Sequence, residues 1–213
     1  NDLGNLFSRV VSMTHKYFDG SVPQADTDIN TDFEMGMAAN AGKAIEAYEK
    51  YMQGFEFHKA LAAVWEFIGQ MNKYIDVTAP WVLAKKKSNR KQLETVIYNL
   101  LEGLRIISGL IYPVMPATAA TMQKHLGMDP DAPFFHLYGL KKWGGLASGT
   151  KLPKAIALFP RIDTTKNPVN EPETTQQRPA TPEIKSEITI EEFAKIDLRV
   201  ATIVKAEKIP KAR

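Results

Sequence analysis

Three groups of side chains in this sequence have the types and the spacing needed to bind an unpaired nucleic-acid base. Asn5 and Arg9 are four residues apart, so on a helix they share one face, where an amide and a planar cation can donate to and accept from a base edge. Trp81 follows Pro80, which ends a helix, and from a loop at this point its ring can project as a stacking plate. A basic cluster suited to phosphates comes next: Lys85, Lys86, Lys87, Arg90 and Lys91.

An RNA loop with a splayed base needs these three features together: edge donors and acceptors, a stacking surface and neutralisation of the backbone. Each feature also has an ordinary structural explanation. Arg9 can be a solvated helix residue, Trp81 can belong to the core, and the basic cluster can be a wet surface. The spacing alone leaves both interpretations open.

Signatures of catalysis are missing from the sequence. The histidines are far apart and lack zinc-site spacing: His15, His58, His125 and His136. With no cysteine, disulfides and thiolate nucleophiles are excluded. The stretch GGLASGTK at residues 144–151 has two glycines at P-loop spacing, but its Thr and Lys come in the wrong order, so we interpret it as a flexible turn. We therefore expect no catalytic residue, metal or cofactor in this segment.

Composition limits how a nucleic acid could be bound. The 213 residues are 44% hydrophobic and carry 27 Lys and Arg against 24 Asp and Glu, a net charge of only +3. Contact with a polyanion should then be local instead of spread over the whole surface. No apolar run is long enough to span a membrane, and no leader precedes the first helical pattern. A cytoplasmic protein is the simplest interpretation, although both ends look cut.

Helical periodicity covers most of the first 126 residues and predicts the elements that position these side chains. The first helix has an apolar stripe of Leu3, Leu6, Phe7, Val10, Met13 and Phe18 and an opposite polar stripe of Asn1, Asn5, Arg9, Ser12 and Lys16. Further helices are expected at about residues 31–53, 55–77, 90–112 and 117–126. The buried stripe expected in the third of these five helices is Phe57, Leu61, Val64, Trp65, Ile68, Met71 and Ile75. Long helices joined by short breaks predict an all-α antiparallel bundle.

The rest of the chain has a different character. Residues 127–163 are irregular and should lie as a strap against the bundle, completing a domain of residues 1–163. Residues 164–186 are rich in Pro and Thr without an aromatic, which predicts a linker. Residues 187–213 include an alternating stretch, LRVATIVK, typical of a strand, and one strand cannot stand alone. We expect a truncated β segment there.

Three ordered blocks, NDLGNLFSRVVSMTHKYFDG, NKYIDVTAPWVLAK and ALFPRID, closely resemble the anticodon-binding region of methionyl-tRNA synthetases. The tail ITIEEFAKIDLRVATIVKAEKIP resembles the start of the OB-fold tRNA-binding domain that follows it in many bacterial members. The resemblance covers nearly the whole chain.

The resemblance implies that the bundle reads the CAU anticodon loop of methionine tRNAs. Trp81 would stack on an anticodon base, and Arg9, steadied by Asn5, would hydrogen-bond the edge of that base, most plausibly cytosine. Weaker candidates for RNA contact are Asn1, Lys85, Lys86, Lys87 and Arg90.

The resemblance also implies a parent enzyme, a methionine–tRNA ligase of the cytoplasm that uses ATP and Mg²⁺ in a catalytic domain on the same polypeptide. The H-I-G-H and K-M-S-K-S signatures of that domain do not occur in these residues, so this segment should have no ligase activity. The parent would dimerise through a complete C-terminal domain, and the segment alone would be monomeric and would not bind a membrane.

Two alternatives remain at this point. One is a helical scaffold that binds only proteins, which salt sensitivity separates from an RNA-binding module because phosphate contacts release counterions. The other is an anticodon-binding domain from a synthetase for another amino acid, which exchange of the anticodon in a binding assay would reveal.

Overall fold

The computed structural model describes residues 2–25, 32–128, 137–160, 189–190 and 195 of the chain. The chain divides into two units, residues 1–161 and 162–213, and the fold described below belongs to the first. The linker predicted at residues 164–186 lies outside the described residues. So does the strand predicted in the segment at 187–213, of which only residues 189, 190 and 195 are described. Both remain predictions.

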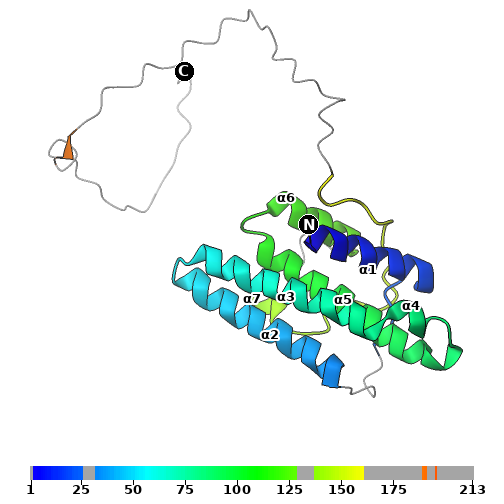
Figure 1. Cartoon of the computed structure of the whole chain (residues 1–213). Helices are drawn as coiled ribbons and strands as arrows, with labels where there is room; N and C mark the ends of the chain where they lie inside the picture. The colour runs from blue at the N-terminus through cyan, green and yellow to red at the C-terminus, as the bar shows by residue number, and fades with distance from the viewer. Residues whose placement is uncertain (1, 26–31, 129–136, 161–188, 191–194, 196–213) are drawn as a thin grey trace, which may run out of the picture. The chain divides into compact units, whose positions relative to one another are not determined.

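The described part of the first unit is helical, as the periodicity predicts (Figure 1). Its long helices are α1 (Asp2–Phe18), α2 (Asp32–Gln53), α3 (Phe57–Thr78) and α5 (Arg90–Ile111). Its short helices are α4 (Pro80–Leu83), the 3₁₀ turn η1 (Lys87–Asn89), α6 (Pro116–His125) and α7 (Leu137–Leu140). The expected all-α bundle is confirmed, and the bounds of the predicted helices differ from the observed ones by only one or two residues.

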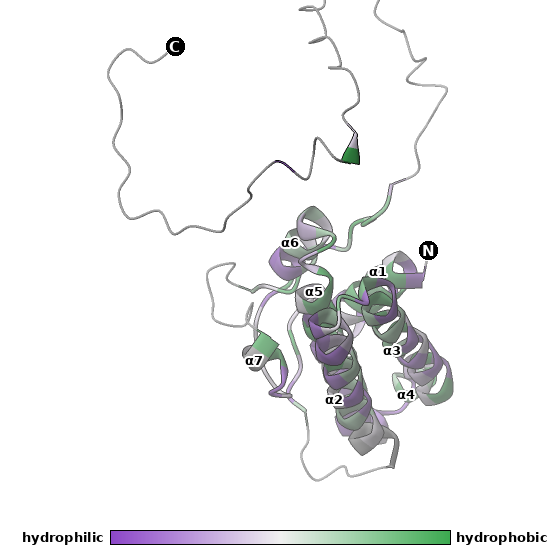
Figure 2. Cartoon of the chain, turned by 90° about the vertical axis from the view of Figure 1, so that its left-hand side faces the viewer, coloured by the Kyte–Doolittle hydropathy of each residue, from purple (hydrophilic) through white to green (hydrophobic). Residues whose placement is uncertain are grey.

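The bundle is organised around α5, which packs against every other helix of the described part. Its residues are buried along most of their length, including Leu100, Leu101 and Leu104, which have no exposed surface. Hydrophobic and hydrophilic residues alternate along the surrounding helices (Figure 2), as amphipathic helices around a core require. The α1 stripe predicted to face inward does so, since Leu3, Leu6, Phe7 and Val10 are buried.

Two residues of the stripe predicted in α3 are exposed, and that part of the prediction is wrong, while Leu61 is only partly buried. Phe57 is 50% exposed and Trp65 is 39% exposed. Each residue turns an α-helix by about 100°, so the buried face set by Val64, Ile68 and Ile75 leaves Trp65 to one side of it. Phe57 is the first residue of α3 and lies at the N-terminal end of that helix.

Residues 137–160 lie against the bundle, as the predicted strap should, and the glycine turn within them is firmly held. The buried carboxylate of Glu102 accepts hydrogen bonds from the backbone amides of Gly144 and Gly145 at 2.8 Å and of Leu146 at 3.1 Å. Arg105 donates to the same carboxylate at 2.7 Å. The interpretation of this turn as flexible is therefore wrong, because its amides bind an internal carboxylate.

A second set of contacts ties the strap to α5 and to the end of α1. The hydroxyl of Tyr98 donates to the backbone oxygen of Leu146 at 3.0 Å, and burial raises the pKa of this tyrosine. Farther along, the amide of Leu152 donates to the oxygen of Gly20 at 2.8 Å. The turn that follows α1 is thus fixed from outside, which keeps the C-terminal end of α1 in place.

The described helices include none that is both long enough and apolar enough to cross a membrane.

Candidate nucleic-acid interface

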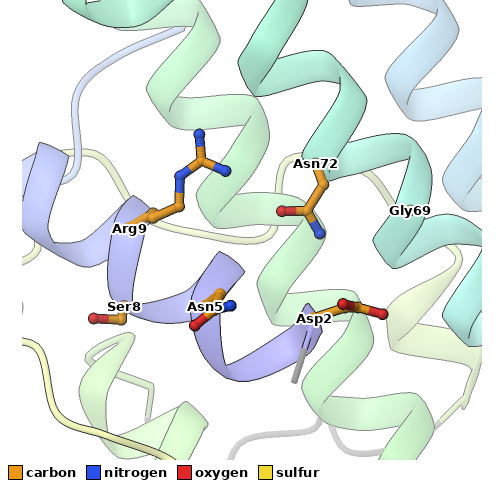
Figure 3. Close-up of a pocket in the computed structure, with 6 residues that line it drawn as sticks. All are labelled: Asp2, Asn5, Ser8, Arg9, Gly69 and Asn72. Carbon is orange, nitrogen blue, oxygen red and sulfur yellow. The ribbon is translucent and has the colours of Figure 1, made fainter.

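An open cleft of about 400 Å³ lies between α1 and α3 (Figure 3). The helix α1 contributes Asp2, Asn5, Ser8 and Arg9, and α3 contributes Gly69 and Asn72. The cleft arises because α1 turns its apolar stripe toward the core and leaves its polar stripe at the border with α3. Asn5 and Arg9, predicted from their spacing to act together, are brought into this one cleft.

Arg9 is oriented by a residue that the sequence analysis did not single out. One of its terminal nitrogens donates to Asp76 Oδ1 of α3 at 3.2 Å, and the two side chains are 41% and 66% exposed. So exposed an ion pair contributes at most about 1 kcal/mol to stability. In the structure this contact turns one terminal nitrogen of the guanidinium toward α3, and the remaining N–H groups have no hydrogen-bond partner among the described residues. The partner that the structure gives Arg9 is therefore Asp76, and the expectation that Asn5 steadies Arg9 stays a prediction.

Two carboxamides complete the polar lining of the cleft. Asn72 donates from its side-chain nitrogen to the backbone oxygen of Ile68 at 3.1 Å, which leaves its side-chain oxygen as an acceptor. Asn5 is exposed, and its side chain has no hydrogen-bond partner among the residues that the structure describes. The cleft therefore offers an amide, an acceptor oxygen and part of a guanidinium to a ligand.

Asn72 and Asp76 were missed in the sequence although a signal was present. Together with Gly69 they recur at helical spacing on the polar face of α3, inside the stretch that also contains its buried stripe. This polar stripe was overlooked because the prediction for α3 considered only the apolar positions.

Trp81 stands beyond the C-terminal end of α3, just after the helix that carries Asp76. Its ring is 43% exposed, while its neighbours Pro80 and Leu83 are buried and hold α4 against α5. It does not line the cleft of Asn5 and Arg9. The structure thus leaves Trp81 exposed and outside the lining of that cleft, and its part in the site stays a prediction.

The ring of Trp81 projects from a short helix and not from a loop, which corrects the prediction. Ala79 has φ 42° and ψ 66°, a left-handed conformation that ends α3 and lets α4 begin at once. Proline is well suited to a first helical position because its missing N–H would be unpaired there in any case. Pro80 therefore ends one helix and begins the next.

The basic cluster lines a separate cavity of about 610 Å³. Lys85, Lys86, Lys87 and Arg90 surround it together with Lys16 and Tyr17 of α1. Arg90 is engaged internally, since it donates to Glu94 at 2.9 Å and to the backbone oxygen of Tyr17 at 2.9 Å. Asn1, the remaining weaker candidate, lies outside the described residues.

The polar groups of the cleft can be matched to the edge of a base. Cytosine presents acceptors at N3 and O2 and a donor at its amino group, which the N–H groups of Arg9 and the amide oxygens of the cleft can match. Among the described residues, no group of three His, Asp or Glu side chains could hold a metal ion.

Comparison with known proteins points to one family. Residues 22–171 match the model of the anticodon binding domain of methionyl tRNA ligase. The chain is 42% identical, over 98% of its length, to the methionine–tRNA ligase of Caldanaerobacter subterraneus, and 36% identical over its full length to that of Bacillus subtilis. It spans about a third of the length of each, 32% and 33% respectively.

A solved structure agrees with the sequence comparison. Mycobacterium tuberculosis methionyl-tRNA synthetase in complex with methionyl-adenylate matches 76% of this chain, with a TM-score of 0.69 and 34% identity. The match covers 31% of that protein. Fold and sequence therefore give the same relationship.

Proposed function

Because this chain belongs to the methionyl-tRNA synthetase family, we propose that its helical bundle reads the anticodon loop of methionine tRNAs. The observation that carries the proposal is the cleft between α1 and α3, where Asn5, Arg9 and Asn72 present hydrogen-bonding groups to solvent. The exposed ring of Trp81 lies beyond the end of α3, on the same run of chain as Asp76. These groups match what an unpaired base requires.

Recognition would divide between the edge and the face of one base. Arg9, held by Asp76, donates to N3 and O2 of cytosine, and the side-chain oxygen of Asn5 or Asn72 accepts from its amino group. Trp81 stacks on a base of the same loop, a contact worth about 1–3 kcal/mol. The bundle supplies no chemistry in this scheme, and its contribution is selection of the tRNA.

The full-length protein would then be a methionine–tRNA ligase. It would attach methionine to its tRNA with ATP, in a catalytic domain on the same polypeptide, and would act in the cytoplasm. Its dimerisation would depend on a complete C-terminal OB-fold domain, and the present chain would be a monomer. These statements follow from family membership, and the family match argues against a synthetase for another amino acid.

Binding of an anticodon stem-loop tests the proposal. We expect the stem-loop of a methionine tRNA to bind at low salt more tightly than one whose first anticodon base is changed. Trp81→Ala should weaken binding of the cognate RNA by about 1–3 kcal/mol. Val82→Ala is the matched control, because Val82 is the adjacent exposed residue of α4. Equal affinity for both RNAs in the wild-type chain would contradict anticodon reading.

A further inference from the structure

The second cavity, between the end of α1 and the turn after α4, combines four lysines from two parts of the chain. We call it the lysine pocket and define it by Lys16, Lys85, Lys86 and Lys87, with Tyr17 in its wall. Leu83 is buried beneath it and belongs to the helix that presents Trp81. Lys16 comes from α1, so the sequence cluster alone could not reveal this member.

These lysines are not neutralised by the protein. In the part of the chain that the structure describes, none of the four forms an ion pair with a carboxylate. Other cations do have such partners, for example Lys59 with Glu56 and Lys141 with Glu49. Clustered like charges repel one another, and a bound anion removes that cost.

Arg90 differs from the lysines although it lines the same cavity. Its guanidinium lies 4.1 Å from the centre of the Phe18 ring and is bound to Glu94 and to the backbone oxygen of Tyr17. These contacts join α5 to the end of α1. Arg90 thus lines the lysine pocket as an engaged cation, whereas the four lysines have no carboxylate partner among the described residues, and Lys16 lies 5.4 Å from the centre of the Tyr17 ring.

The pocket is separate from the cleft of Asn5 and Arg9, but two elements carry residues of both the pocket and the proposed reading site. Lys16 belongs to the polar stripe of α1 that also carries Asn5 and Arg9. Lys85 follows Trp81 by one helical turn, and its amide donates to the oxygen of Val82 at 3.1 Å. Only about one helical turn of chain therefore separates the ring that would stack on a base from the first lysine of the cavity.

We propose that the lysine pocket binds backbone phosphates of the RNA strand whose base is held at Trp81, with Lys16 as a contact residue. The inference rests on the proposed function and adds a subsite that sets affinity without reading sequence. Lysine suits this role, because its ammonium group is a point charge that attracts a phosphate without selecting a base edge.

The test separates charge from selectivity. Binding of the cognate and the base-changed stem-loops is measured over a series of KCl concentrations with the full 213-residue chain. The variants are Lys16→Gln/Lys86→Gln and the control Lys124→Gln, an exposed lysine of α6 at the far end of α5. Circular dichroism confirms that each variant is folded.

The double variant should weaken binding of both RNAs by the same factor and leave their affinity ratio unchanged. The slope of log K against log salt should become shallower by about 0.7 for each phosphate that the protein no longer neutralises. The control should match the wild type. An unchanged slope, or a changed ratio of affinities, would overturn the proposal.

Further outcomes show whether the bound phosphate belongs to RNA, and whether the subsite alone or the proposed function as a whole is wrong. If inorganic phosphate binds the wild-type chain more tightly than the double variant while the stem-loop binds both equally, the pocket selects free phosphate and the assignment to RNA is wrong. If binding is selective but does not depend on the lysines, the proposed phosphate subsite is wrong and the proposed function still stands. If the wild-type chain binds neither RNA, the proposed function fails and the subsite fails with it.

Discussion

Arg9 combines a positive charge with a planar set of donors, and a lysine in its place would keep only the charge. Its charge attracts RNA, and its planar group, fixed on one side by Asp76 at 3.2 Å, can present parallel N–H donors to a base edge. The carboxylate takes only part of the guanidinium, so orientation is gained while the donors that face the cleft are kept.

Arg9→Lys should therefore reduce selectivity more than it reduces electrostatic attraction. We expect the preference for the cognate stem-loop over the base-changed one to fall by about 1–3 kcal/mol, because a lysine cannot present the paired donors. The salt dependence should stay near that of the wild type, since the charge is kept. Fluorescence anisotropy at several salt concentrations measures both quantities. Full selectivity in Arg9→Lys would show that Arg9 contributes only its charge.

The residues of the site differ in how far sequence could predict them. Asn5 and Arg9 were found because helical spacing puts both on one face, and they do line one cleft. Asp76 could not be assigned to Arg9, because pairing of α1 with α3 depends on packing between segments distant in sequence. Lys16 was predicted only as a polar face residue, and its place beside Lys85 follows from the same tertiary packing.

The glycine turn and α5 form a buried polar junction that holds the strap in place. Glu102 and Arg105 have no exposed side-chain surface, and the carboxylate also accepts from three backbone amides. A buried charge of this kind is tolerated only when all its partners are present. The resemblance of this turn to a P-loop is thus physical in part, because glycine amides do surround an anion, but the anion is internal.

Glu102→Gln should destabilise the bundle by about 3–5 kcal/mol, because it leaves Arg105 buried without its counter-charge and turns an amide donor toward backbone donors. Urea unfolding followed by circular dichroism measures the change in stability. Glu94→Gln is the matched control on the same helix. It breaks the partly exposed pair with Arg90 and should cost no more than about 1 kcal/mol.

A double variant separates the ion pair from the backbone contacts. Glu102→Leu/Arg105→Met removes both charges but leaves the amides of Gly144, Gly145 and Leu146 without an acceptor. It should remain less stable than the wild type, since the buried amide of Leu146 is left unsatisfied at a cost of about 1–3 kcal/mol, while the amides of Gly144 and Gly145 are less buried and cost less. Recovery of wild-type stability would mean that the carboxylate does not hold the strap.

The helices could be predicted from sequence where burial of one face gives a periodic apolar pattern. Their ends were harder to predict where they depend on contacts with other elements. The pattern of α5 gave correct bounds because apolar residues surround it. At Ala79 the same kind of reasoning gave a helix end but missed α4, because the continuation of the chain depends on a left-handed backbone conformation and on burial of Leu83. Trp65 was wrongly placed because four-residue steps drift around the helix.

Charge over the whole sequence explains why the binding sites must be local. Lys and Arg exceed Asp and Glu by only +3, and several cations are matched by carboxylates in the described part of the bundle. In the proposed scheme the lysines around the second cavity supply part of the attraction to a polyanion. If only a few phosphate contacts cause the salt dependence of binding, replacing two lysines should make that dependence clearly weaker.

The composition of residues 164–186 predicts a linker between the bundle and the truncated β segment that follows it. This stretch contains Pro168, Pro172, Pro179 and Pro182 and no aromatic residue, so it has little apolar surface to bury. A brief digestion with a protease of broad specificity should cut within it first and leave a product close to residues 1–163, identified by mass. That product should keep the stem-loop affinity of the whole chain if the cleft and the lysine pocket suffice for binding, since both lie before residue 94. Cleavage inside the bundle at an equal rate would contradict the predicted boundary. A weaker affinity in an intact bundle would place part of the RNA contact beyond residue 163.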